Sequence, residues 1–311
     1  MIELRGLCID DVEMVHAVIR SAEIADRIPI VTPRQEVDDM FADPYFEPDT
    51  DGVVVEVDGS IVGWGRIHHR PSTADFDKAY IQGDIHPHYR RRGLGTALLR
   101  WQLERAAQCM TTVPSRYIRA DVYDWRSDAC ALFEAGGMKP VRYTDELRMP
   151  LAIPQLPSPL AVEVMRWTSD HTEGARRVIN EAFTDHWGST PRDEEAFRSL
   201  LSTYGTRLDL SHVAVAGGRI VGAVLNFHVP EDEEVTGRLD GWIGTLGVAR
   251  PFRRRGVATA LIVASLGSFR AAGLTHAMIG VDSENPSGAH HLYRRLGFEP
   301  VNRSVTYELV V

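Results

Sequence analysis

Residues 253–258 read Arg253-Arg254-Arg255-Gly256-Val257-Ala258, and residues 90–95 read Arg90-Arg91-Arg92-Gly93-Leu94-Gly95. In both places a β-type run precedes the arginines and a long helical pattern follows them. A strand that turns sharply into a helix directs unpaired backbone N–H groups, and the positive end of the helix dipole, at one point. Glycines there allow a close approach to the backbone, and arginines attract anions. Each stretch therefore predicts a cradle for a phosphate or pyrophosphate.

The two cradles belong to a repeat that spans the chain. The hairpin pattern of residues 53–63 recurs at 212–222, and Leu132–Met138 recurs as Leu292–Phe298. The hairpin, cradle and third motif recur 159, 163 and 160 residues further on. Because these offsets are nearly constant, we infer a tandem duplication with domains at 1–150 and 161–311. Four prolines between 150 and 159 predict an extended linker over 151–160.

Each copy shows the same order of expected elements. A strand and a helix (11–22; 170–183) lead to the hairpin, then to a strand (79–85; 241–248), the cradle and a long helix. A strand (116–123; 276–282), a short helix and a closing strand (141–149; 301–311) follow. In the second long helix the spacing of Ala260, Ala264, Gly267 and Ala271 predicts the buried face. The pattern indicates an α/β or α+β fold with helices covering a central sheet.

The composition and charge of the chain favour some classes of protein and disfavour others. The chain has 311 residues, 44% of them hydrophobic, and a net charge of −9. This favours a globular protein, and the acidic balance disfavours nucleic acid as a partner. With no run of about 18 apolar residues and no leader pattern, we expect a cytoplasmic protein without a membrane span. Three widely spaced cysteines, Cys8, Cys109 and Cys130, are expected to be reduced thiols rather than a zinc site.

One known family combines these motifs. An Arg-x-x-Gly-x-Gly/Ala turn after a strand, with Leu-Tyr-x-x-x-Gly-Phe about 40 residues later, resembles the GNAT superfamily of acyl-CoA-dependent N-acetyltransferases. The tandem layout is similar to that of the mycothiol synthase type. The resemblance implies two GNAT-like domains, each with a mostly antiparallel sheet, one splayed parallel strand pair and flanking helices. It also implies acetyl-CoA as cosubstrate, no metal, a small-molecule amine as acceptor, and a monomer or homodimer.

The resemblance also assigns cofactor-binding residues. Backbone N–H groups of two strand-end residues would face the thioester and the pantetheine arm, and the cradle would hold the pyrophosphate. In the second copy the implied residues are Leu246, Gly247, Val248, Arg253, Arg254, Arg255, Gly256, Val257, Ala258, Thr259, Asn285 and Ser287. In the first copy they are Arg90, Arg91, Arg92, Gly93, Leu94 and Gly95.

The resemblance assigns the chemistry to the second copy. Tyr293 matches the family tyrosine that protonates the departing thiolate, although a tyrosine there also suits packing against the sheet. Phe133 occupies the corresponding position of the first copy and has no proton to donate. We therefore expect a catalytic second domain, and a degenerate first domain with a structural or cofactor-holding role.

The general base is not assigned by the resemblance, because Trp242 stands where many relatives have a strand glutamate. Asp240, acting through water, and His186 are the candidates, with Glu284 a third. A solvated strand-end carboxylate and a helix cap are the alternatives for the first two. Asp185, Trp187 and Trp242 are the expected substrate-binding residues.

Three functions remain open at this stage. The favoured one is an acetyl-CoA-dependent N-acetyltransferase that acetylates the primary amine of a small molecule. The alternatives are an acyl-CoA-binding sensor or pseudoenzyme, and a protein N-acetyltransferase. The acceptor depends on loops, so a mycothiol precursor, an aminoglycoside, an amino acid and a polyamine all remain candidates.

Overall fold

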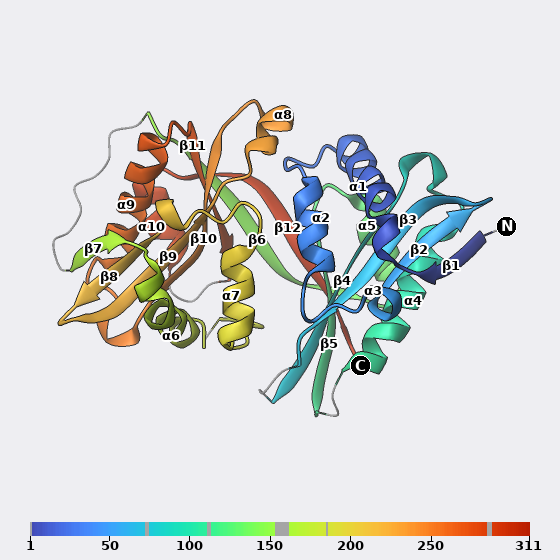
Figure 1. The fold of residues 1–311 in the computed structure, drawn as a ribbon, viewed down its shortest axis with the longest axis horizontal. Helices are drawn as coiled ribbons and strands as arrows, with labels where there is room; N and C mark the ends of the chain where they lie inside the picture. Colours follow the sequence, from blue (N-terminus) through green and yellow to red (C-terminus); the bar gives the residue numbers. More distant parts are fainter. Residues whose placement is uncertain (1, 72–74, 111–112, 153–161, 185, 285–287) are drawn as a thin grey trace. The chain divides into compact units, whose positions relative to one another are not determined.

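A computed structural model describes residues 2–71, 75–110, 113–152, 162–184, 186–284 and 288–311. Contacts divide the chain into two compact units (Figure 1). The first unit comprises residues 1–143 and 303–311, and the second comprises residues 144–302. Both have the predicted α/β architecture, and each is described by itself below.

The first unit is a six-stranded sheet with helices on both faces. Its strand order is β1-β2-β3-β4-β5-β12, and only the β4–β5 pair is parallel. The strands are β1 (Ile2–Gly6), β2 (Gly52–Val57), β3 (Ser60–His69), β4 (Phe76–Ile85), β5 (Ser115–Tyr123) and β12 (Glu299–Val310). The helices are α1 (Val12–Asp26), α2 (Arg34–Phe41), α3 (Pro48–Asp51), α4 (Leu94–Cys109) and α5 (Ser127–Ala135).

The second unit repeats this plan. Its strand order is β6-β11-β10-β9-β8-β7, and only the β10–β11 pair is parallel. The strands are β6 (Lys139–Pro150), β7 (Glu163–Arg166), β8 (His212–Ala216), β9 (Arg219–Phe227), β10 (Asp240–Val248) and β11 (His276–Asp282). The helices are α6 (Thr172–Ala182), α7 (Glu194–Ser202), α8 (Glu233–Thr236), α9 (Val257–Ala271) and α10 (Ala289–Leu296).

The closing strands of the two copies are exchanged, which the boundaries 1–150 and 161–311 did not anticipate. Residues 144–150 of β6 pair with β11 in the second unit, and residues 304–310 of β12 pair with β5 in the first. Leu147 of β6 packs in the same core as Ile279, and Tyr307 of β12 packs with Ala120. Each exchanged strand therefore supplies apolar side chains to the core of the other copy.

The predicted linker begins later than expected. Leu151 is buried, its N–H bonds to the carbonyl of Thr275, and its carbonyl accepts hydrogen bonds from Arg270. Leu151 is therefore part of the second unit rather than of an extended linker. Residues 153–160 of the predicted linker lie outside the described residues.

Successive residues of β3 point to opposite faces of the sheet, and different helices cover the two faces. Trp64 packs in one core with Val15 of α1, whereas its neighbour Gly65 lies under Leu98 of α4. The second unit has the same three layers, with α6 and α7 on one face and α9 and α10 on the other. The cradle after β4 or β10 consequently lies beside both helical layers.

The predicted buried face of α9 is only partly right. Val257, Leu261, Leu266 and Phe269 fill the core, and of the predicted residues Ala260 is buried, whereas Ala264, Gly267 and Ala271 are more exposed and line a groove. Small side chains at helical spacing matched the periodicity of a core face, but the larger apolar side chains bury more area and determine which face packs inward.

Candidate functional site

The two cradles have the same backbone conformation. Arg91 and Gly93 have positive φ angles of 62° and 81°, and Arg254 and Gly256 have φ angles of 61° and 83°. Helix α4 begins directly after Gly93, and α9 begins directly after Gly256. Successive N–H groups in such a turn form a concave anion site, which the N-terminus of the helix reinforces. The predicted anion cradle thus has suitable geometry in both units.

The three arginines of each cradle have different roles. Arg90 Nε donates to the carbonyl of Ile85 (2.9 Å), and its other nitrogens bond both carboxylate oxygens of Asp26 (2.6 and 2.8 Å). Arg253 likewise bonds the carbonyls of Val248 (3.1 Å) and Ala182 (3.0 Å). The first arginine therefore positions the cradle against the strand end and the first helix of its unit, so its side chain is committed to protein partners.

The third arginine of each cradle stacks on an aromatic ring. Arg92 stacks over the ring of Tyr89, and Arg255 stacks over the ring of Phe252, at 5.0 and 5.7 Å from the ring centroids. No described residue forms an ion pair with the middle arginine of either cradle, which is Arg91 or Arg254. The middle guanidinium is therefore available to a phosphate.

A parallel strand pair splays next to each cradle. Pairing of β10 with β11 runs from Asp240–His276 to Ile243–Ile279, and a bulge then shifts the register of β10 against β9. A side chain at Gly244 would overlap the ring of Phe227, so the bulge requires glycine there. In the first unit the pairing of β4 with β5 ends at Tyr80–Arg119. The strand segments that precede both cradles are thus separated from their parallel neighbours.

The remaining cofactor residues predicted for the second unit lie on this framework. Leu246, Gly247 and Val248 form the end of β10, and Val257, Ala258 and Thr259 form the first turn of α9. A Cβ atom at Gly247 would lie 3.1 Å from Cβ of Ala182, so α6 packs directly on this strand. Leu94 and Gly95 form the first turn of α4 in the first unit. Asn285 and Ser287 lie outside the described residues.

Tyr293 lies on α10 with 7% of its surface exposed. Its ring packs edge-to-face against Phe298, with centroids 6.2 Å apart. Burial raises the pKa of the Tyr293 hydroxyl to about 12. Within the described chain no side chain forms a hydrogen bond with this hydroxyl. Tyr293 is therefore protonated at neutral pH and has a proton to donate.

The candidate base Asp240 is buried at the start of β10. Its carboxylate lies 3.5 Å from Arg238 and 4.0 Å from His276, and its Oδ1 has no hydrogen-bond partner among the described residues. Six residues separate it from Leu246, or about 20 Å at about 3.3 Å per residue. Asp240 therefore lies too far from a group held at Leu246 to contact it directly. A role of Asp240 as general base would need an intervening water or substrate.

The other acceptor-side predictions are dispersed. His186 is exposed and packs beside Phe183, with ring centroids 5.2 Å apart, and Trp187 is half-buried. Trp242 is half-buried in β10 and pairs in register with Phe227. Asp185 lies outside the described residues. Among the parts that the structure describes, no hydrogen bond or ion pair joins His186, Asp240 and Tyr293.

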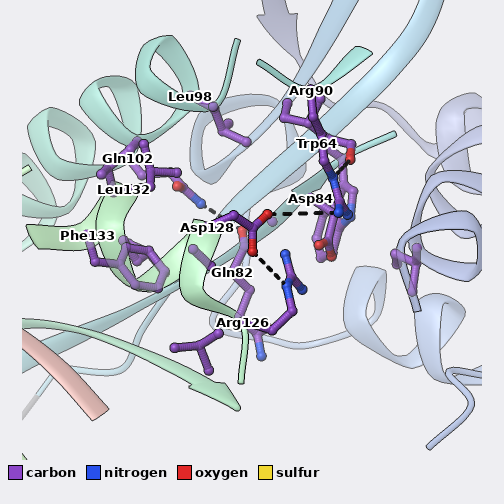
Figure 2. Close-up of a pocket in the computed structure, with 18 of the residues that line it drawn as sticks. Trp64, Gln82, Asp84, Arg90, Leu98, Gln102, Arg126, Asp128, Leu132 and Phe133 are labelled. Atoms are coloured by element: carbon purple, nitrogen blue, oxygen red, sulfur yellow. Dashed lines mark hydrogen bonds and ion pairs between the residues drawn. The ribbon is translucent and has the colours of Figure 1, made fainter. Parts of the chain in front are cut away.

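A cavity of about 710 Å³ opens beside the first cradle (Figure 2). Arg91 and Gly93 of the cradle line it, together with Leu98 of α4 and Phe133 of α5. In Figure 2 the polar residues Asp84, Arg90 and Arg126 lie apart from the apolar Leu132 and Phe133. The phenyl ring at the position of Tyr293 thus faces a cavity, as expected of a site that retains its shape without the hydroxyl.

Asp84 of β4 is the residue that the sequence analysis missed. Its carboxyl lines the cavity, and burial raises its pKa to about 7 against the opposing charges of Arg126 and Arg90. The repeat contained a usable signal, because offset 163 aligns Asp84 with Gly247. A carboxylate in one copy opposite a glycine in the other marks a position where the two environments differ.

Two negative findings bear on the site. No helix in the described part of the chain is long and apolar enough to cross a membrane. Across the described residues, no three His, Cys, Asp or Glu side chains gather in a group that would hold a metal ion. Cys8, Cys109 and Cys130 are free thiols.

Comparisons with known proteins match both units to one family model. The family model described as "Acetyltransferase (GNAT) family" matches residues 20–138 and 173–298. The chain is 29% identical over 307 residues to a mycothiol acetyltransferase of Salinispora arenicola, covering 92% of this chain and 93% of the relative. It is 30% identical over 251 residues to the mycothiol acetyltransferase of a Parafrankia species, covering 72% and 73%.

Solved structures share the tandem fold. A GCN5-related N-acetyltransferase from Sphaerobacter thermophilus aligns with a TM-score of 0.76 and 23% identity, covering 99% of this chain and 95% of the other. A tandem GNAT protein from the clavulanic acid biosynthesis pathway aligns with a TM-score of 0.70 and 18% identity, covering 100% and 98%. Both likenesses extend over two successive domains.

Proposed function

Since the chain belongs to the acetyltransferase (GNAT) family, whose members take an acetyl group from acetyl-CoA, we propose that its second unit acetylates the primary amine of a small molecule. One observation carries the choice of unit. The two cradles share their backbone conformation, yet only the second unit has a tyrosine, Tyr293, where the first has Phe133. Both units can thus bind an anion at the cradle, but only the second unit has a side chain at this position that can donate a proton.

The residues of the second unit fit acetyl-CoA, which supplies the acetyl thioester. The left-handed turn at Arg254 and Gly256 presents converging N–H groups to a pyrophosphate, and Arg254 has a guanidinium without an ion-pair partner among the described residues. The end of β10 at Leu246 and Val248, which is separated from β11, offers backbone groups to the pantetheine amides. Arg253 holds the strand end and the cradle together.

Proton movements follow from the same geometry. Tyr293 remains protonated at neutral pH and would donate its proton to the CoA sulfur as the C–S bond of the tetrahedral intermediate breaks, so that CoA leaves as the neutral thiol. The acceptor amine must lose a proton before it attacks. Asp240 through water and His186 remain the candidates for that base.

The acceptor class rests on the relatives. Because the curated relatives are named mycothiol acetyltransferases over most of the chain, a mycothiol precursor is the first acceptor to test. Trp242 at the position of the family glutamate favours including aminoglycosides, amino acids and polyamines in the panel. We further propose that the enzyme works in the cytoplasm without a metal, as a monomer or homodimer.

Replacement of Tyr293 by Phe tests the proposal. We expect kcat for CoA release to fall at least tenfold with the best amine, while the Kd for acetyl-CoA changes by less than about twofold, because only the proton donor is removed. The matched control is Phe133→Tyr, which adds a hydroxyl to the first unit and should leave kcat unchanged.

Three outcomes would contradict the proposal. An unchanged rate for Tyr293→Phe over the whole pH range would remove the tyrosine from the mechanism. If no amine accelerates CoA release from the wild-type protein, an acyl-CoA sensor becomes the better description. Acetylated lysines or N-termini in a treated lysate would instead indicate a protein acetyltransferase.

A further inference from the structure

The cavity of the first unit extends beyond its cradle to the opposite face of the sheet. We call this part the α1-side chamber and define it by Ile19, Glu23, Thr32, Trp64 and Asp84, all of which line the cavity. Trp64 packs with the α1 face of the sheet, whereas Leu98 and Phe133 line the cavity from α4 and α5. A ligand in the chamber would therefore occupy a different side of the sheet from a ligand on α4.

The charged residues around Asp84 are already paired with one another. Asp26 accepts hydrogen bonds from Arg90 and forms an ion pair with Arg126 at 2.7 Å. Glu23 accepts from the N–H and hydroxyl of Thr32 and pairs with Arg20.

Asp84 differs from these neighbours. No described residue donates a hydrogen bond to its carboxylate or forms an ion pair with it, although it faces the cavity. The groups that face it are Glu23 and Asp26 from α1, Arg90 from the cradle, and Arg126 and Asp128 at the start of α5. The chamber thus contains one carboxylate whose hydrogen-bonding capacity is unused.

The second unit shows that this arrangement is specific to the first. At the equivalent position Gly247 packs so closely that even a Cβ atom would lie 3.1–3.2 Å from Ala182 and Ile179 of α6. No carboxylate fits there. In the first unit the corresponding helix, α1, leaves space that Asp84 and the chamber occupy.

We propose that the α1-side chamber of the first unit is a second ligand site, which binds the ammonium group of a small primary amine through Asp84. An ammonium carries three donors and a positive charge, so it supplies both the hydrogen bonds and the counter-charge that Asp84 lacks. Arg91 lines the cavity at the cradle, where it can serve an anion, but Arg90 and Arg126 are paired with Asp26, so an anionic ligand beside Asp84 would meet a like charge. The site is separate from the acetyl transfer proposed for the second unit.

Binding should depend on pH in a defined direction. Burial holds the pKa of Asp84 at about 7, so the carboxyl is mostly protonated at pH 6 and mostly ionised at pH 8. The ionised fraction rises about tenfold over this range. Amines that remain protonated throughout should therefore bind about tenfold more tightly at pH 8 than at pH 6.

The test uses the full chain labelled with 5-fluorotryptophan and followed by ¹⁹F NMR. The Trp64 signal, assigned with a Trp64→Phe variant, reports the chamber, whereas the Trp187 and Trp242 signals report the second unit. Putrescine and ethanolamine are the probes, and 1,4-butanediol and ethylene glycol are their uncharged matches. We expect the amines, and not the diols, to shift the Trp64 signal with the stated pH dependence.

Two variants and one direct titration locate the effect. Asp84→Asn should weaken amine binding at pH 8 at least tenfold and abolish its pH dependence. Asp128→Asn, which alters a cavity carboxylate already paired with Arg126, should change it less than about threefold. In the wild-type protein, saturating putrescine should lower the pKa of Asp84, read from its ¹³C carboxyl signal, by at least one unit, a measurement that requires no variant to fold.

The proposal is overturned if the diols bind as well as the amines, or if the pKa of Asp84 does not change with putrescine. It is also overturned if only the Trp187 and Trp242 signals move. That last result would support an acceptor site in the second unit, so the failure of this inference and that of the proposed function are distinguishable.

Discussion

Individual residues in this chain acquire their roles from what surrounds them. Arg90 and Arg91 are adjacent and chemically identical, yet the first is bonded to Asp26 and the second has no ion-pair partner among the described residues. Tyr293 and Phe133 differ by one hydroxyl, and burial keeps that hydroxyl protonated. A residue's type therefore suggests a chemistry, and its local packing determines whether that chemistry is available.

His212 provides a prediction at this scale. Burial lowers the pKa of its imidazole from 6.5 to about 4, and its Nε2 lies 3.2 Å from Ser268 Oγ. Between pH 6.5 and 4 the His212 imidazole is protonated in the unfolded chain but remains neutral in the folded chain. The free energy of unfolding therefore falls as the pH falls. The full effect is about 3 kcal/mol at about 1.36 kcal/mol per pKa unit.

Urea denaturation at pH 7, 5.5 and 4.5 checks this prediction. His212→Leu should flatten the pH dependence over that range, whereas substitution of the exposed His291 should leave it as in the wild type. Equal pH dependence in the wild type and His212→Leu would show that other groups control acid stability.

At the scale of elements, the cradle is a strand–turn–helix segment that occurs with the same backbone conformation in both units. Each copy joins a strand end to a helix start through two left-handed residues, and each is held to the first helix of its unit by an arginine. The local sequence is sufficient to specify such a turn, because glycine adopts a positive φ without steric penalty. This is why the cradles could be predicted from a single sequence.

Substitution of Gly256 by Ala tests the cradle as an element. Its φ of 83° should cost about 1–2 kcal/mol of stability in an alanine variant. If its N–H groups bind acetyl-CoA, the Kd should also rise at least fivefold, measured by calorimetry. Gly218 in the β8–β9 turn has a similar φ of 73°, and a Cβ atom there would meet no other atom within 4 Å, so Gly218→Ala is the matched control.

The control separates strain from binding. Gly218→Ala should lose similar stability and retain the wild-type Kd. A parallel loss of affinity in both variants would mean that the cradle contributes through stability alone.

At the scale of the whole molecule, the exchange of closing strands makes each unit depend on chain from the other copy. Residues 1–150 contain β6, whose segment 144–150 belongs to the second unit, and they lack β12, whose Val305 and Tyr307 pack against β5. An uncovered sheet edge invites pairing with another chain. The units are therefore not the same as the sequence repeats.

A shortened chain of residues 1–150 should consequently dimerise or aggregate and unfold with low cooperativity. A chain in which residues 1–138 are joined directly to 299–311 should be a monomer with a cooperative transition. Light scattering and thermal unfolding measure both. A stable monomer of residues 1–150 would show that β6 replaces β12 on β5, and that the exchange is not needed for folding.

Much of the molecule could be predicted from its sequence. The duplication, the strand–cradle–helix order, the parallel strand pair and the contrast between Tyr293 and Phe133 follow from local patterns and from a family resemblance carried by those patterns. Local patterns suffice here because a turn, a helix start and the presence of a hydroxyl depend on a few neighbouring residues. Strand ends such as those of β10 and β11 were accordingly predicted to within one residue.

The tertiary structure alone decided which closing strand completes which sheet, which face of α9 is buried, and that Asp84 faces a cavity. The closing strands of the two copies have similar apolar alternation, so either suits either sheet by pattern, and only side-chain packing distinguishes them. Burial and pKa are properties of the assembled neighbourhood, since they depend on groups distant in sequence, such as Asp26 and Arg126 around Asp84. A sequence states which groups are present, and packing determines which of them have their hydrogen bonds satisfied.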